Sequence, residues 1–241
     1  MKKKFKLSPM LLLAIAAVLL LASTVGSTQA ALIHYNDDNY RAKVETFDID
    51  VTLFENDKPV EAGTVLLGNL LGEDAKLVPG KTYDEKIQVA NSGQIDSYVR
   101  VLIKKYWVDE SGNKESVKLD PSYIELIPSA SGKWVKSAES TREREIFYYT
   151  DVLTASETEE KEMTDAVIDG IRIDEAISKE VIQYTNGNKV SYEYKYDGCK
   201  FVVEVEAQAI QTHNAEAAIK SAWGVDAVIT VIDEKPKLSI N

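Results

Sequence analysis

Side chains that bind metals or act as nucleophiles are scarce in this sequence. It holds two histidines, His34 and His213, and one cysteine, Cys199, among 241 residues. A helical zinc site needs two histidines one turn apart, whereas these two are 179 positions apart. A single cysteine cannot form a disulfide within the chain. We therefore predict no catalytic residue, no metal ligand and no cofactor.

The acidic residues allow one further test, for a calcium loop. Asp109, Ser111 and Asn113 stand at alternating positions, and Asp120 follows Asp109 by eleven residues, which imitates the ligand order of such a loop. Lys114, however, stands where the loop needs glycine, and Asp120 stands where it needs a bidentate glutamate. We interpret the segment as a charged hairpin turn.

The aromatic residues raise the question of a sugar-binding platform. Tyr106, Trp107 and Trp134 fall on predicted strands, and Tyr148 and Tyr149 are adjacent, so only one of that pair can face outward. Aromatic residues on alternating strands usually belong to the core or to cross-strand pairs. Core packing is the expected role, and a carbohydrate-binding platform remains the alternative.

Apolar and polar residues alternate through most of the chain, which is the pattern of half-buried strands. Turn residues such as Asn186-Gly187 and Asp197-Gly198 separate these runs and favour the positive φ angles of tight hairpins. About ten strands are predicted, at 47–53, 87–89, 98–108, 124–127, 134–135, 146–149, 167–173, 181–185, 190–196, 201–210 and 227–232. This number of short strands, with turns between them, predicts an all-β sandwich of a single domain.

One short helix is expected near the C-terminus. Asn214 is its predicted N-cap, residues 215–223 form its body, and Gly224 stands where a C-terminal glycine is preferred. Residues 233–241 are expected to be a tail without anchoring chemistry.

Alternation also predicts which side chains the sandwich buries. Trp107 and Phe201 should lie in the core, while Asp48, Asp50 and Glu204 should face water.

The first thirty residues have the three-part form of a secretory signal peptide. Four lysines within the first six residues precede the apolar run Met10–Ala22, and small residues follow it. This run of thirteen residues is shorter than the ~20 that span a bilayer, so a retained signal anchor is only the alternative. Cleavage after Ala30 places Thr28 and Ala30 at the two small-residue positions, and the mature domain then covers 31–241, beginning at Ala31.

Charge excludes one class of partner. The chain has 28 basic and 39 acidic residues, a net charge of −11, and the leader holds four of the lysines and no acid, so residues 31–241 carry −15. A surface this acidic repels phosphate backbones and anionic lipids. We expect no nucleic-acid partner, and membrane contact only through the uncleaved leader.

Three segments carry a resemblance to a known group of exported proteins. They are the cleavage region 26–32 followed by 47–51, the Pro79-Gly80 turn of 78–83 leading to Asn91-Ser92-Gly93 within 89–96, and the late strand 203–214. In this order they resemble the alternate-signal exported family, which includes TasA and camelysin and whose leader is removed by a SipW-type signal peptidase. The resemblance implies a jelly-roll-like antiparallel β-sandwich exported by a Gram-positive cell. For fibre-forming members it also implies assembly in the extracellular matrix of biofilms.

The leading functional hypothesis is therefore structural: a secreted, non-catalytic protein of the cell surface or biofilm matrix. The extended N-terminal segment 31–41 carries Leu32, Ile33 and Tyr35 among polar residues. Once cleavage frees it, such a segment can add a strand to a neighbour's sheet, so we expect self-association into fibres. A SipW-type signal peptidase is the expected partner during export. The alternatives are a secreted camelysin-like metallopeptidase, a label that such relatives carry, or a ligand- or carbohydrate-binding module.

Overall fold

The computed structural model describes residues 33–37, 50–60, 66–67, 70, 77–109, 111–115, 117–156, 158, 161–186 and 189–240. For residues 33–37 and 189 this description covers the backbone alone. The leader 1–30, its cleavage residues Thr28, Ala30 and Ala31, and also Leu32 and Asp48 lie outside the described residues. Within the described part of the chain, no helix has the length and apolar character needed to cross a membrane.

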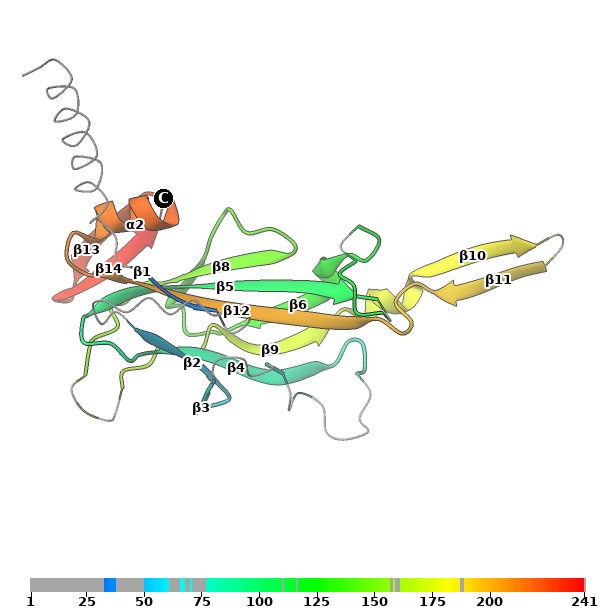
Figure 1. Ribbon diagram of the computed structural model, residues 1–241, viewed down its shortest axis with the longest axis horizontal. Coiled ribbons are helices and arrows are strands. Elements are labelled where there is room, and N and C mark those ends of the chain that lie inside the picture. Colours follow the sequence, from blue (N-terminus) through cyan, green and yellow to red (C-terminus); the bar gives the residue numbers. More distant parts are fainter. Residues whose placement is uncertain are drawn as a thin grey trace, which may run out of the picture.

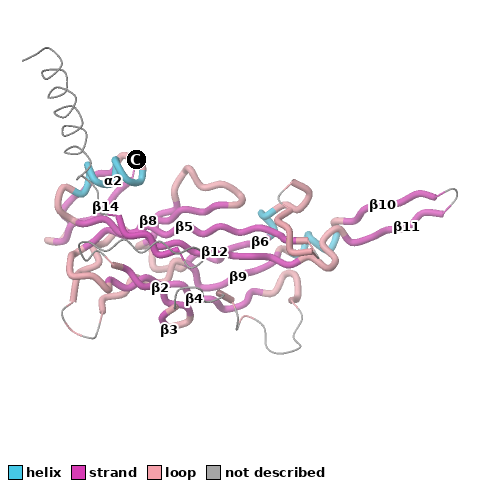
Figure 2. Tube along the Cα trace, viewed as in Figure 1, coloured by secondary structure: helices cyan, strands magenta, loops and turns pink. Residues whose placement is uncertain are grey.

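Two antiparallel sheets of five strands each form a sandwich (Figure 1). The first sheet contains, in spatial order, β1 (Ile33–Asp37), β12 (Lys200–Gln211), β5 (Ser97–Val108), β8 (Arg144–Tyr149) and β7 (Trp134–Lys136). The second sheet contains β3 (Lys58–Pro59), β2 (Val51–Glu55), β4 (Thr82–Asn91), β9 (Ile168–Ile173) and β6 (Ile124–Pro128). Strands dominate the trace in Figure 2, and the predicted all-β sandwich is confirmed.

Two hairpins and one α-helix complete the molecule. One hairpin is formed by β10 (Val181–Asn186) and β11 (Lys189–Tyr194), and the other by β13 (Ala227–Ile232) and β14 (Lys235–Ile240). The α-helix is α2 (Ala215–Trp223). Two short 3-10 helices are also present, η1 (Pro121–Tyr123) and η2 (Glu175–Lys179). The β10–β11 hairpin projects from one end of the sandwich, while α2, β13 and β14 lie at the opposite end (Figure 1).

The main core lies between the two sheets. Every second residue of β5 points into it, so Val99, Val101 and Ile103 are fully buried. Trp107, on the same face, is 3% exposed, as predicted. Phe201 is only half-buried, so its predicted burial is wrong. It is the second residue of β12, near the end of the strand, and its ring contacts the Trp107 ring edge-to-face.

The outer face of the first sheet has a second, smaller core beneath α2. Tyr98 and Tyr148 point outward from β5 and β8, and Ile219 and Trp223 of the helix pack with them. The Tyr148 and Trp223 ring centroids are 5.6 Å apart. The helix thus buries a sheet face that would otherwise expose large apolar residues.

The bounds of α2 match the sequence prediction, but its N-terminus lacks the predicted side-chain cap. Gly224 ends the helix in the left-handed conformation, with φ of 75°. Asn214 precedes the helix, yet its side chain makes no capping hydrogen bond, because its backbone is left-handed (φ 57°) rather than extended.

The expectation that residues 233–241 form a tail is wrong for 235–240, which form a strand. β14 pairs with β13 along its whole length, Leu238 is buried in the second core, and Lys237 forms an ion pair with Asp151. Asp233 and Glu234 make the turn, with φ of 50° and 63°. Two residues with positive φ form a type I′ hairpin turn, which usually contains glycine. The turn has no glycine here, which explains why the sequence did not reveal it.

Candidate functional site

The predicted assembly segment forms an edge strand of the first sheet. β1 pairs antiparallel with β12, in a register that runs from Ile33 opposite Ile210 to Asp37 opposite Glu206 (Figure 1). Ile33 and Tyr35 therefore lie within this strand. In the single chain, the segment that follows the predicted cleavage site completes the chain's own sheet.

β1 covers only part of the β12 edge. β5 pairs with all twelve residues of β12 on one side, whereas β1 pairs with five residues, 206–210, on the other. Among the described residues, no strand pairs with 200–205 on that side. A partly open sheet edge is a template for strand addition.

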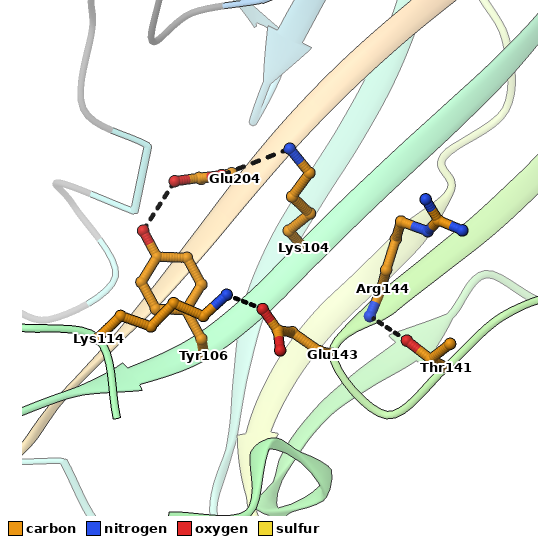
Figure 3. Close-up of a pocket in the computed structure, with 7 residues that line it drawn as sticks. All are labelled: Lys104, Tyr106, Lys114, Thr141, Glu143, Arg144 and Glu204. Carbon is orange, nitrogen blue, oxygen red and sulfur yellow. Dashed lines mark hydrogen bonds and ion pairs between the residues drawn. The ribbon is translucent and has the colours of Figure 1, made fainter. Parts of the chain in front are cut away.

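A surface pocket of about 450 Å³ lies on the outer face of the first sheet. Lys104, Tyr106, Lys114, Thr141, Glu143, Arg144 and Glu204 line it. Figure 3 shows the Tyr106 hydroxyl donating to Glu204, at 2.7 Å, and Lys114 directed at Glu143. The Lys114 ammonium also lies 4.7 Å from the centroid of the Tyr106 ring. The two carboxylates of the pocket are thus engaged by its own side chains.

These contacts favour a structural role for the pocket. Burial and the hydrogen bond to Glu204 raise the pKa of Tyr106 to about 12, so the hydroxyl is held as a donor to that carboxylate. The Lys114–Glu143 pair joins the turn after β5 to the turn before β8. Exposed ion pairs of this kind stabilise a fold by about 0–1 kcal/mol each.

Cys199 and His213 are far apart in the structure. Cys199 precedes β12 and His213 follows it, so the twelve residues of an extended strand, about 40 Å, separate them. The half-buried Cys199 thiol donates to the carbonyl of Asp197 at 3.7 Å, and His213 is exposed. His34 lies in β1, opposite Ala209. In the part of the chain that the structure describes, no group of three or more His, Cys, Asp or Glu residues is placed to hold a metal ion.

The segment that imitates a calcium loop is a turn held by its own hydrogen bonds. One oxygen of Asp109 accepts from the backbone N–H groups of Ser111 and Asn113, both at 2.9 Å. These backbone bonds, from Asn113 first, lower the pKa of Asp109. Asp120 caps η1 through the N–H of Ser122 and pairs with Arg142 at 2.7 Å. The interpretation as a charged turn is confirmed.

The aromatic residues weighed as a platform are mostly internal. Trp107, Tyr148 and Tyr149 are buried, and Trp134 is half-buried against Tyr149, with ring centroids 4.9 Å apart. The most exposed aromatic side chains of the described residues are instead Tyr184, Tyr192 and Tyr194, all on the β10–β11 hairpin. The sequence indicated this hairpin, but alternation does not reveal that a ribbon has no core on either face.

Two surfaces of the molecule are therefore candidates for function: the β1–β12 edge and the exposed hairpin. Comparison of the chain with protein-family models, curated proteins and solved structures found no match.

Proposed function

We propose that this chain is an exported, non-catalytic structural protein of the cell surface or biofilm matrix, whose subunits polymerise by exchanging β1 after the leader is removed. One observation carries the proposal: the strand that follows the predicted cleavage point at Ala30 is an edge strand paired over five residues. An edge strand near a chain terminus can leave its own sheet while the other strands of that sheet stay paired.

The energetics permit exchange. Each backbone hydrogen bond contributes about 0.5–1.5 kcal/mol net, so a five-residue strand binds modestly to its own sheet. The same register on a neighbour's β12 restores the same bonds, as in domain swapping. Thirteen residues separate Asp37 from Val51, a length that reaches about 45 Å when extended. That reach is sufficient to cross to an adjacent subunit.

The net charge of the subunits makes polymer growth depend on salt and pH. At −15 for residues 31–241, two subunits repel each other. Salt screens this repulsion, and mildly acidic pH reduces it, so both should accelerate polymer growth.

A reversible cross-link tests the exchange directly. Asp37 and Glu206 lie directly opposite each other in the β1–β12 register. In a Cys199→Ser background, the variant Asp37→Cys/Glu206→Cys would lock β1 onto its own sheet by a disulfide. We expect the locked chain from Ala31 onward to stay monomeric in light scattering, and growth to resume after reduction.

The single variant Glu206→Cys is the matched control and should grow under both conditions. A second arm deletes 31–41, which should abolish growth. Polymer growth by the locked, oxidised chain, or by the deletion variant, would remove the basis of the proposal.

A further inference from the structure

The β10–β11 hairpin extends beyond the sandwich as a two-stranded ribbon (Figures 1 and 2). All six residues of β10 are exposed, and so are residues 190–194 of β11. A ribbon of this kind buries no core of its own and is marginally stable in isolation. Its exposed side chains are therefore available for contact with another molecule.

Aromatic contacts hold the base of the ribbon in place. The Tyr196 ring lies 5.0 Å from the Trp107 ring and 5.7 Å from the Tyr123 ring, measured between centroids. The Tyr123 hydroxyl donates to Glu180 at 3.1 Å, and the backbone N–H of Lys195 donates to the carbonyl of Glu180 at 2.9 Å. These contacts fix the base of the hairpin to the end of the sandwich, so its faces are presented in a defined direction.

The two faces of the ribbon differ in charge. Residues directly opposite in an antiparallel pair share a face. One face, which we call the tyrosine face, therefore consists of Val181, Gln183, Thr185, Val190, Tyr192 and Tyr194. It contains no charged residue. The opposite face includes Glu193, which accepts a hydrogen bond from Tyr184 and so raises the pKa of that tyrosine.

Tyr192 and Tyr194 dominate the tyrosine face. Their side chains are 64% and 62% exposed, and they lie two residues apart on one strand, a separation of about 6.6 Å. Gln183 stands directly opposite Tyr192 and offers an amide donor and acceptor beside the rings. Exposed rings in a row, with a neutral hydrogen-bonding group alongside, suit the apolar faces and hydroxyl groups of successive sugar rings.

The area of the face argues against a second copy of the chain as the occupant. Two strands of six residues present a face about 20 Å by 10 Å, or about 200 Å², whereas a stable protein interface takes about 800 Å² from each partner. A neutral polymer has many repeats, which compensate for a small contact.

We propose that the tyrosine face of the β10–β11 hairpin binds a neutral, linear polysaccharide, with Tyr192 and Tyr194 stacking on adjacent sugar rings and Gln183 bonding their hydroxyl groups. The binding does not depend on polymerisation through β1, because the two surfaces belong to different sheets.

Affinity electrophoresis of the chain from Ala31 onward tests the proposal. Native gels would contain hydroxyethyl cellulose or galactomannan as neutral polymers, or polygalacturonate as an anionic one. We expect retardation in at least one neutral gel and none in the anionic gel. Because the ligand is neutral, the retardation should persist from about 0.05 M to about 0.5 M salt. The variant Tyr192→Ala/Tyr194→Ala should bind about tenfold more weakly or worse.

Tyr184→Ala is the matched control, since it removes a tyrosine from the opposite face of the same ribbon. It should leave the retardation unchanged, and Tyr192→Phe, which keeps the ring, should bind nearly as well as the unmodified chain. An unchanged thermal transition in the double variant shows that the fold is intact. The proposal fails if neither neutral gel retards the chain, if Tyr184→Ala weakens binding equally, or if the double variant loses only self-association.

Discussion

The ammonium group of Lys105 lies 2.7 Å from a carboxylate oxygen of Glu145 inside the sandwich, where the two side chains are only 6% and 8% exposed. Lys105 also donates to the carbonyl of Ile124 at 2.6 Å. These three residues belong to β5, β8 and β6, so the contacts tie the first sheet to the second. Both charges are paired, which is the condition under which the interior tolerates them.

Replacing one partner should therefore be costly. Glu145→Gln leaves a buried ammonium group without its counter-charge, which typically costs about 3–5 kcal/mol. Urea denaturation at pH 7 measures this loss. The double variant Lys105→Met/Glu145→Leu should recover much of the lost stability, and a double variant as unstable as Glu145→Gln would contradict the role of the pair.

Acid should also remove the stability that the Lys105–Glu145 ion pair provides. Burial alone raises the pKa of Glu145, but hydrogen bonds and charge from Lys105 and Lys136 outweigh it, so the pKa lies below 4.5, its ordinary value. A lowered carboxyl pKa stabilises the fold fully above that value, and the stabilisation is lost as the pH falls below it. The difference in stability between the unmodified chain and Glu145→Gln should shrink when denaturation is repeated near pH 3.

Glu85 should show the opposite pH dependence. Burial first, opposed by a hydrogen bond from Asn56 and supported by the neighbouring Glu55, raises its pKa to about 7. Its ionisation above pH 4.5 favours the unfolded chain, so this residue destabilises the fold increasingly up to about pH 7. Glu85→Gln should raise the melting temperature at pH 8 and change it little at pH 4. The exposed Glu139→Gln is the control, and an equal effect at both pH values would show that Glu85 is not protonated in the fold.

A close approach of two strands predicts the effect of a small substitution. A Cβ added to Gly170 in β9 would lie 2.8 Å from the carbonyl oxygen of Tyr83 and 3.0 Å from Thr82 Cγ2. Gly170→Ala must push β4 and β9 apart, and overpacking of this kind costs about 1–3 kcal/mol. Thermal unfolding measures the cost. A melting temperature equal to that of the unmodified chain would mean that the strands adjust freely.

The metallopeptidase alternative has a direct test as well. We expect the purified chain from Ala31 onward to show no proteolysis in a gelatin zymogram, with or without a chelator. Chelator-sensitive cleavage that comigrates with the chain would favour the enzyme over the structural protein.

Alternation predicted most of the sandwich because strands that face one core show a period of two. Alternation did not predict a charged side chain in the core or a hairpin turn without glycine. Lys105 follows Lys104 and looks like another surface residue, yet its ion pair with Glu145 allows it to face the core. The β13–β14 turn uses Asp233 and Glu234 in place of glycine.

The candidate sites were harder to predict than the fold. The sequence identified 31–41 as an extended segment, but the strand that it pairs with follows it by more than 160 residues. Tyr192 and Tyr194 alternate with polar residues in the same way as core positions do. Only the projection of the hairpin away from the sandwich distinguishes them from buried tyrosines.

β12 also determines how the molecule would carry mechanical load. It runs from the base of the β10–β11 hairpin to the end where α2 begins, and all twelve of its residues pair with β5 (Figure 1). In a fibre, a neighbouring subunit would pull on β12 through β1, and a bound polysaccharide would pull on it through the hairpin. The resulting tension is directed along β12. In that direction the hydrogen bonds that hold β1 on residues 206–210 are sheared together, whereas a perpendicular pull would open them one at a time. A fibre built in this way would yield first at the five-residue pairing of β1, while the twelve-residue pairing of β12 with β5 keeps each subunit folded.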